Sequence, residues 1–218
     1  MSRKKKTGGW RRSQREDFFL KKAQGRGLVS RAYFKLQELD AKFDLLKPKQ
    51  SILELGAAPG GWVRYIEEKL SGHGNLYIAV DPSPVKSSGL AKIISGKSNE
   101  PRVSQEIERI LGSKKLDLVL SDMAPNITGV RVVDDSASRE LAEEALNTAF
   151  SYLAPGGRMV AKLFQGSEAQ SFMAETKKCF LKTVLFKPAA SRSESREIFL
   201  VADGFKAGRR TMSLGRTC

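Results

Sequence analysis

The stretch Ser51-Ile-Leu-Glu-Leu-Gly-Ala-Ala-Pro-Gly-Gly-Trp62 joins a short apolar run to a turn rich in glycine and proline. The apolar run, Ile52 to Leu55, is typical of a buried strand, and a helical pattern follows from Trp62 to Leu70. A strand, a glycine turn and a helix in this order bring the backbone of an α/β sheet close to a nucleotide-like ligand. Glycine is needed there because a Cβ would block the approach.

The turn differs from the common phosphate-binding turns. Ala58 stands where a dinucleotide-binding turn has the glycine that meets the pyrophosphate, and Pro59 stiffens the turn. The turn also lacks the Lys-Ser/Thr pair of a phosphate loop. These features disfavour a nicotinamide oxidoreductase and favour a ligand with an adenosine and no pyrophosphate, of which S-adenosylmethionine is the obvious example. The alternative is a tight turn with a structural role only.

The composition favours one domain and a polyanionic partner. The chain has 218 residues, which suits a single domain with a sizeable core. Its formal net charge is +14, from 38 Lys and Arg against 24 Asp and Glu, and this excess favours nucleic acid or an anionic membrane as partner. No apolar run approaches transmembrane length, and no apolar segment follows the basic N-terminus as in a secretory signal.

The scarcity of histidine and cysteine argues against several kinds of chemistry. His73 is the only histidine and lies in a glycine-flanked turn, which argues against a Ser-His-Asp hydrolase and a histidine zinc site. Cys179 and Cys218 are far apart in the sequence and lack metal-binding spacing. A reducing, cytoplasmic setting is the simplest interpretation, and proton transfer must rely on Lys, Asp or Glu.

We expect three segments along the chain: a basic arm over 1–29, a folded domain over 30–204 and a basic tail over 205–218. The arm contains many lysines and arginines but only two acids, and Trp10, Phe18 and Phe19 are interleaved with them. Such an arm either follows RNA phosphates, with an aromatic ring available for stacking, or serves as a solubilising tail.

Two predicted strands end in carboxylates. Asp81 closes the strand that starts at Asn75, roughly 20 residues beyond the glycines, where a carboxylate can accept hydrogen bonds from both ribose hydroxyls of an adenosine. The alternative is a strand-end acid in a turn. Asp122 closes the strand that starts at Leu116. Because ligands bind at the carboxyl ends of strands in open α/β sheets, Asp122 is placed to take part in chemistry.

Two lysines occupy unusual positions. Lys162 lies in the predicted strand Arg158–Phe164, whose other residues after Arg158 are apolar, and a buried ammonium there is costly unless it is paired. This favours a functional role over a strand-end lysine that reaches water. Lys35 lies at the edge of the apolar stripe of a helix predicted over Ser30–Leu46. From position alone it is interpreted as a snorkelling surface lysine.

The remaining patterns complete an α/β domain. Strands are expected over 91–95, 158–164, 182–187 and 197–202, and helices over 103–111, 138–153 and 166–180. The last two strands are joined without a helix, so they should be antiparallel.

Five pieces of the sequence carry a family resemblance: Ser30-Arg-Ala-Tyr-Phe-Lys-Leu36, Leu55-Gly-Ala-Ala-Pro-Gly-Gly-Trp62, Ser121-Asp-Met-Ala-Pro-Asn126, Lys162-Leu-Phe-Gln-Gly166 and Ser195-Arg-Glu-Ile198. Together they resemble the FtsJ/RrmJ family of ribosomal RNA 2′-O-methyltransferases. The resemblance implies a Rossmann-like S-adenosylmethionine-dependent methyltransferase fold, with a seven-stranded, mostly parallel sheet whose last strand is antiparallel. It also implies methylation of a uridine ribose in the 23S RNA of the large ribosomal subunit.

The resemblance further implies a catalytic tetrad, which falls on Lys35, Asp122, Lys162 and Glu197. The enzyme must align the 2′-oxygen, methyl carbon and sulfur and help to remove one proton. Lys162 is the hypothesised base, because burial and the nearby Lys35 would lower its pKa. Asp122 would steer this lysine and lie near the sulfonium, and Glu197 would orient the other groups.

For the cofactor, the resemblance implies a wall around the methionine part and a carboxylate on the ribose. The residues expected to bind it are Gly56, Gly60, Trp62, Asp81 and Asp122. One position departs from the family pattern: Lys97 stands where the family usually has an acid on the adenine side. Backbone groups or Asn99 are candidates to replace that acid.

Several alternatives stay open from the sequence. A base-amino methyltransferase usually has Asn/Asp-Pro-Pro-aromatic after the fourth strand, and Asp122-Met-Ala-Pro125 lacks the aromatic residue. Transfer RNA or a messenger cap would suit the same tetrad, as would an inactive RNA-binding assembly factor, although the intact tetrad argues against inactivity. The short chain favours the ribosomal branch, and a monomer is the default expectation.

Overall fold

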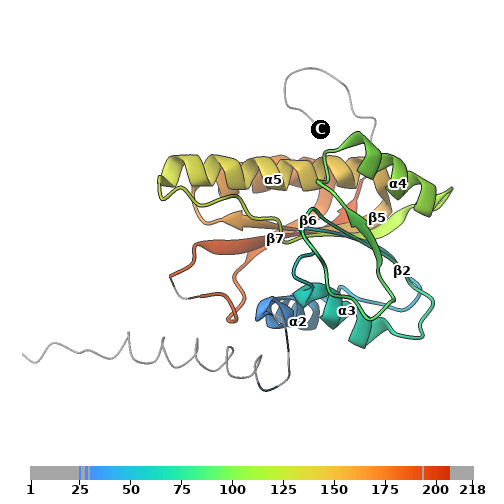
Figure 1. Cartoon of the computed structure of the whole chain (residues 1–218). Coiled ribbons are helices and arrows are strands. Elements are labelled where there is room, and N and C mark those ends of the chain that lie inside the picture. The colour runs from blue at the N-terminus through green and yellow to red at the C-terminus, as the bar shows by residue number, and fades with distance from the viewer. Residues whose placement is uncertain (1–24, 26–27, 29, 193, 207–218) are drawn as a thin grey trace, which may run out of the picture.

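A seven-stranded sheet with the strand order β3-β2-β1-β4-β5-β7-β6 forms the centre of the protein (Figure 1). The computed structural model describes residues 25, 28, 30–192 and 194–206. The predicted basic arm, apart from two of its residues, and the predicted tail beyond Lys206 therefore lie outside the described residues.

The strands confirm the predicted sheet. Neighbouring strands from β3 to β5 run parallel, and β7 runs antiparallel to both β5 and β6. The bounds are β1 Ser51–Leu55, β2 Leu76–Asp81, β3 Lys92–Ser95, β4 Leu116–Ser121, β5 Leu153–Phe164, β6 Phe180–Phe186 and β7 Glu197–Phe205. All five residues of β1 are buried, as expected for a central strand covered on both faces.

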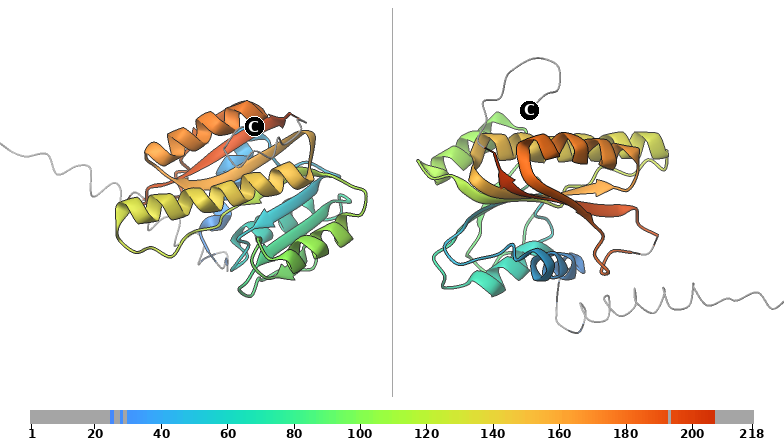
Figure 2. Two further views of the ribbon diagram at one scale, coloured as in Figure 1. Left: turned by 90° about the horizontal axis from the view of Figure 1, so that it is seen from above. Right: turned by 180° about the vertical axis from the view of Figure 1, so that it is seen from behind.

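Helices cover both faces of the sheet. Their bounds are α2 Ala32–Phe43, α3 Gly61–Leu70, α4 Pro101–Leu111, α5 Arg131–Tyr152 and α6 Ser167–Cys179. α2 and α3 pack on one face, and α4, α5 and α6 pack on the other (Figures 1 and 2). None of the helices in the described ranges combines the length and apolarity that a membrane crossing requires.

Several predicted boundaries were wrong, among them the end of α2 and the starts of α5 and β5. α2 ends at Phe43, because Asp44 adopts a left-handed conformation (φ 51°) before Pro48 is reached. α5 begins at Arg131 rather than Ser138. The strand predicted from Arg158 begins at Leu153. Leu153 pairs with Leu116 and Arg158 with Leu118, so the ladder with β4 is irregular where Pro155, Gly156 and Gly157 lie between these two pairs.

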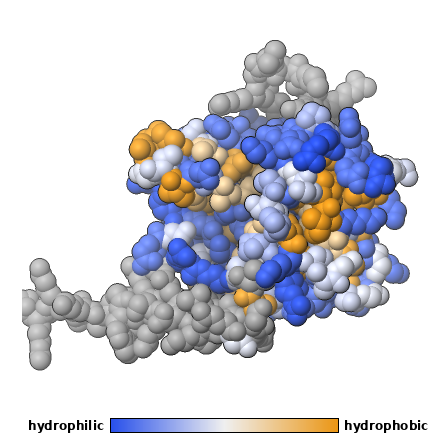
Figure 3. All heavy atoms as spheres, viewed as in Figure 1, coloured by the Kyte–Doolittle hydropathy of each residue, from blue (hydrophilic) through white to orange (hydrophobic). Residues whose placement is uncertain are grey.

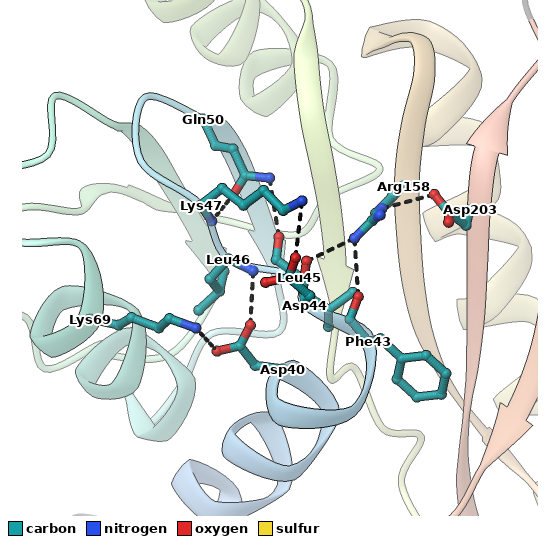
Figure 4. A network of polar contacts seen from close by, with 10 residues as sticks. All are labelled: Asp40, Phe43, Asp44, Leu45, Leu46, Lys47, Gln50, Lys69, Arg158 and Asp203. Atoms are coloured by element: carbon teal, nitrogen blue, oxygen red, sulfur yellow. Dashed lines mark hydrogen bonds and ion pairs between the residues drawn. The ribbon is translucent and has the colours of Figure 1, made fainter.

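A polar network fixes the end of α2 beside the amino end of β1 (Figure 4). The buried carboxylate of Asp40 accepts hydrogen bonds from the N–H of Leu46 (2.9 Å) and the hydroxyl of Tyr65 (2.7 Å), and it pairs with Lys69. Both carboxylate oxygens of Asp40 therefore have partners, and α2 is tied to α3.

Arg158 of β5 continues this network. Its guanidinium donates to the backbone carbonyls of Phe43 (3.1 Å) and Asp44 (2.8 Å) and pairs with Asp203 of β7 (2.8 Å). Arg158 therefore joins the end of α2 to β5 and β7, and these contacts hold α2 against the sheet.

Candidate active site

The register of the sheet brings the predicted residues to one edge. Ser121 of β4 lies opposite Ala161 of β5, so Asp122 and Lys162 are the next residues on neighbouring parallel strands. Glu197 begins the antiparallel β7 opposite Phe164. The ends of two strands and the start of a third therefore place these side chains at the carboxyl edge.

Lys162 and Asp122 form a nearly buried ion pair. Nζ of Lys162 lies 3.1 Å from Oδ1 of Asp122 and also donates a hydrogen bond to the backbone carbonyl of Asp122. The exposed fractions of the two side chains are 8% and 15%. The ammonium in the apolar strand is thus paired, as the cost of burying a charge requires. Oδ1 of Asp122 is buried and has no hydrogen-bond partner among the described residues besides this ion pair.

Lys35 and Glu197 form a second ion pair at the same edge. Nζ of Lys35 lies 2.7 Å from Oε1 and 2.8 Å from Oε2 of Glu197, and Ser191 donates a hydrogen bond to Oε1 (2.8 Å). The Lys35 side chain is only 13% exposed. The interpretation of Lys35 as a snorkelling surface lysine was therefore wrong, because a carboxylate distant in the sequence meets it.

Electrostatics links the two pairs. Burial alone would raise the pKa of Glu197, but the ammonium groups of Lys35 and Lys162 and the hydrogen bonds to its carboxylate outweigh that effect. The pKa of Glu197 therefore lies below its ordinary value, and the group stays ionised at neutral pH. All four predicted tetrad residues lie within one electrostatic cluster.

Glu54 is a site residue that the sequence analysis missed. It is the penultimate residue of β1, is 1% exposed and accepts a hydrogen bond from the hydroxyl of Tyr77. The pKa of Glu54 is raised to about 8, chiefly by burial and further by the charges of Asp122 and Asp81, although the hydrogen bond from Tyr77 acts to lower it. An acid inside an apolar strand is the same signal that identified Lys162, so the sequence contained it.

Asp81 holds the glycine turn. Its carboxylate accepts hydrogen bonds from the N–H groups of Ala58 (2.9 Å) and Ser83 (2.7 Å). Each oxygen keeps a further lone pair, so the predicted contact with a ribose stays a prediction.

The glycines and the tryptophan of the turn have roles within the protein itself. A Cβ on Gly56 (φ 75°) would lie 2.7 Å from the backbone N of Met123, and one on Gly60 (φ 109°) would lie 2.5 Å from the carbonyl oxygen of Lys86. Trp62 is 1% exposed and packs against Phe199, with ring centroids 5.7 Å apart. Glycine is thus required by the close approach of neighbouring loops, and ligand contact by these three residues stays a prediction.

The segment after β3 also joins the site. The backbone N–H of Lys97 donates to Glu100 (3.1 Å). The hydroxyl of Ser98 contacts the sulfur of Met123 (3.3 Å) and donates to Glu144 of α5. This segment therefore meets the loop after β4, and the adenine-side contact stays a prediction.

The carboxyl groups at this edge of the sheet are suited to binding S-adenosylmethionine. Carboxyl groups of Glu54, Asp81 and Asp122 lie at or near the ends of β1, β2 and β4, and Asp122 keeps a buried oxygen without a hydrogen bond. A ligand with a ribose diol and positively charged sulfonium and ammonium groups matches acceptors of this kind.

Residues 28–205 match the model of the FtsJ-like methyltransferases. The chain belongs to this family. The family resemblance drawn from the sequence is therefore confirmed, and the seven-stranded sheet described above is the fold of a family member.

Curated relatives match over nearly the whole chain. "Ribosomal RNA large subunit methyltransferase E" of Legionella pneumophila strain Corby is 41% identical over 94% of this chain and 99% of the relative. The protein of the same name from Marinobacter nauticus is 40% identical with the same coverage. Among solved structures, a Plasmodium falciparum protein assigned as a ribosomal RNA methyltransferase superposes with a TM-score of 0.76. It is 31% identical and covers 83% of this chain and 99% of its own.

Proposed function

We propose that this FtsJ-like methyltransferase transfers the methyl group of S-adenosylmethionine to the 2′-oxygen of a uridine ribose in the 23S RNA of the large ribosomal subunit. The observation that carries the proposal is the pair of adjoining ion pairs, Lys162 with Asp122 and Lys35 with Glu197, at the carboxyl edge of the sheet. The names of the curated relatives support ribosomal RNA of the large subunit as substrate.

Lys162 is the proposed base. Nζ has three positions besides its bond to carbon, and two of them face the carboxylate and the backbone carbonyl of Asp122. In the neutral amine these two positions keep N–H donors, and the third carries the lone pair. Asp122 therefore aims the lone pair away from itself, toward the place where a ribose hydroxyl can lose its proton.

S-adenosylmethionine, when bound, supplies an activated methyl group on a positively charged sulfur. Asp122 and Asp81 are the residues that would hold it, by charge and by hydrogen bonds to the ribose, with Glu54 behind them in β1. The chain itself aligns the 2′-oxygen and removes its proton. The cofactor performs neither task, although its sulfur is a good leaving group.

Lys35 is the proposed positioning cation. Glu197 binds its ammonium through both carboxylate oxygens, and Ser191 fixes the carboxylate in turn. A charge held in this way can bind an oxygen of the substrate ribose or its phosphate. We further propose that the chain acts as a monomer in the cytoplasm, on RNA within the large subunit.

The decisive experiment is a transfer assay with methyl-labelled S-adenosylmethionine. Large subunits from cells that lack the modification and the RNA extracted from them are offered separately to the wild type and to Lys162→Ala. Lys182→Ala serves as control, because Lys182 is an exposed lysine on β6. Label on one ribose 2′-oxygen, lost in Lys162→Ala and kept in Lys182→Ala, supports the proposal.

Two other outcomes would change the proposed function. If the wild type binds cofactor in a calorimeter but labels neither substrate, another RNA such as transfer RNA or a messenger cap is the target. If cofactor does not bind either, an RNA-binding assembly role replaces the enzymatic one.

A further inference from the structure

Four exposed aliphatic side chains gather in the loop after β4 and the first turn of α5. They are Ile127, Val130, Val132 and Val133, with exposed fractions of 67%, 57%, 78% and 50%. Figure 3 shows hydrophobic side chains at this end of α5, at the left of the view. We call these four residues the apolar lip. Single exposed aliphatic residues are common, but a cluster on one loop marks an interaction surface.

The apolar lip borders the candidate active site. The loop that carries it begins directly after Asp122. The first turns of α5 are joined to the site strands, because the Ser138 hydroxyl accepts the N–H of Phe164 (3.1 Å) and Asp135 pairs with Arg196 (3.1 Å to Nη1), the neighbour of Glu197. A substrate bound at Lys162 would therefore extend over this surface.

Hydrogen bonds hold the loop in one shape. The buried carboxylate of Asp134 accepts the N–H (2.8 Å) and the hydroxyl (2.7 Å) of Thr128 and the N–H of Gly129 (3.2 Å). The Thr128 oxygen in turn accepts the N–H of Val130 (3.1 Å). The aliphatic side chains are thus presented on a fixed frame, which lowers the conformational entropy that binding would cost.

Two arginines accompany the apolar lip, and both pair with Asp135. The side chain of Arg131, which lies between two lip residues, is 72% exposed, and that of Arg196 is 31% exposed. The whole chain carries a formal net charge of +14. Apolar contact area together with guanidinium groups is complementary to unpaired RNA, which offers flat base surfaces between phosphates.

We propose that the apolar lip binds the unstacked bases that flank the target nucleotide. The proposal rests on the proposed function, because it requires RNA at the neighbouring site. A ribose can reach Lys162 only if its strand leaves a regular helix locally, and the bases exposed by that change need an apolar surface. Arg131 meets the adjoining phosphates.

The test compares the wild type with one double variant of the apolar lip and with one control variant on β6. Val130→Ser/Val132→Ser removes part of the apolar lip, and Leu181→Ser removes an aliphatic side chain of equal exposure, 78%, on β6. Binding of deproteinised large-subunit RNA is measured without turnover, together with KM for that RNA. The double variant should bind RNA about tenfold more weakly and raise KM to match, while Leu181→Ser behaves as wild type.

Salt dependence separates apolar from ionic contact. The loss in Val130→Ser/Val132→Ser should be the same at low and high salt. Arg131→Ala should instead reduce the slope of log affinity against log salt by roughly 0.7, the value for one phosphate contact on a single strand. Cofactor affinity in a calorimeter should stay within about twofold in every variant, because the apolar lip lies outside the proposed cofactor residues.

The failures are distinguishable. RNA binding and KM unchanged in the double variant overturn the apolar lip. A defect that is confined to assembled subunits and absent with deproteinised RNA also overturns it and identifies a ribosomal protein as the partner. A wild type that binds RNA but methylates neither the deproteinised RNA nor assembled large subunits overturns the proposed function, whereas the binding comparison still decides the role of the apolar lip.

Discussion

Two groups of ion pairs lie at opposite edges of the same sheet and differ in how completely their polar atoms are satisfied. At the amino edge, Arg158 binds two backbone carbonyls and Asp203, and both oxygens of Asp40 have partners (Figure 4). At the carboxyl edge, the buried Oδ1 of Asp122 has only its ion pair with Lys162 and no hydrogen bond within the described ranges, and one position of the Lys162 amine faces away from Asp122.

The difference separates structural from functional use of the same residue types. A fully satisfied network gains nothing from a ligand and holds α2 to the sheet. An incompletely satisfied cluster costs stability in the free protein, and under the proposed function substrate and cofactor would complete it. Variants at the carboxyl edge should therefore change rate, and variants at the amino edge should change stability.

The largest effect is expected at Lys162. Lys162→Met keeps the length of the side chain and removes the proton acceptor. The single-turnover rate of methyl transfer should fall by about 10²–10⁴-fold, the usual contribution of a general base. Cofactor affinity, measured by calorimetry on the same preparation, should change little. A rate within a few-fold of wild type would assign the proton transfer to another group.

The matching change at the amino edge is Arg158→Met. It removes one ion pair and two hydrogen bonds to carbonyls, and the side chain is 25% exposed, so solvent screens part of the loss. The free energy of unfolding in urea should fall by about 1–3 kcal/mol, with an unchanged single-turnover rate at a temperature where the variant is folded.

Arg102→Met is the control for Arg158→Met. Arg102 also forms an ion pair, with Glu100, but its side chain is 64% exposed and the pair is local. Its replacement should change the free energy of unfolding by less than about 0.5 kcal/mol. Equal losses in the two variants would contradict the view that the amino-edge network holds the fold.

Glu197→Gln should have a smaller effect on rate. The amide keeps the shape and the hydrogen bond from Ser191 but loses the charge that binds Lys35. The single-turnover rate should fall about tenfold, since one charge-assisted contact is weakened and the base remains. A loss as large as that of Lys162→Met would mean that Glu197 or Lys35 takes part in the chemistry directly.

The same variant should alter acid stability. The pKa of Glu197 is lowered in the folded protein, so its contribution to stability is present above the ordinary glutamate pKa and is lost as pH falls through the folded value. Urea unfolding below pH of about 4.5 should therefore show a steeper loss in wild type than in Glu197→Gln.

A further pH effect concerns Glu54, whose pKa is shifted in the direction opposite to that of Glu197. Its folded pKa is raised to about 8 from 4.5, so the contribution is fully present below 4.5 and is lost as pH rises through about 8. Unfolding free energies of wild type should fall between these values relative to Glu54→Gln. Parallel pH profiles of the two proteins would show that Glu54 ionises normally.

The sequence predicted the sheet and most of the site because both leave strong one-dimensional signals. Buried strands are continuous apolar runs, and an ion inside such a run, as at Lys162, is conspicuous. Glu54 gives the same signal inside the apolar run Ile52–Leu55, but that run predicts a strand whether or not one of its residues is an acid.

The sequence could not predict contacts between side chains that lie far apart in the chain. Lys35 is an ordinary helix-edge lysine until Glu197 of β7 meets it, and periodicity contains no information on that contact. The start of α5 at Arg131 was missed for a similar reason. Its first turn is exposed and irregular in pattern, and it is fixed by the carboxylate of Asp134 rather than by an apolar stripe.

The most direct test of the central claim is chemical rescue of Lys162→Ala by small primary amines. If the Lys162 amine takes the ribose proton, propylamine should restore part of the methyl-transfer rate in proportion to its free-base concentration. Tetramethylammonium, which carries the charge but cannot accept a proton, should restore none. Equal rescue by both cations, or a Lys162→Ala rate close to that of wild type without any amine, would contradict the assignment of Lys162 as the base.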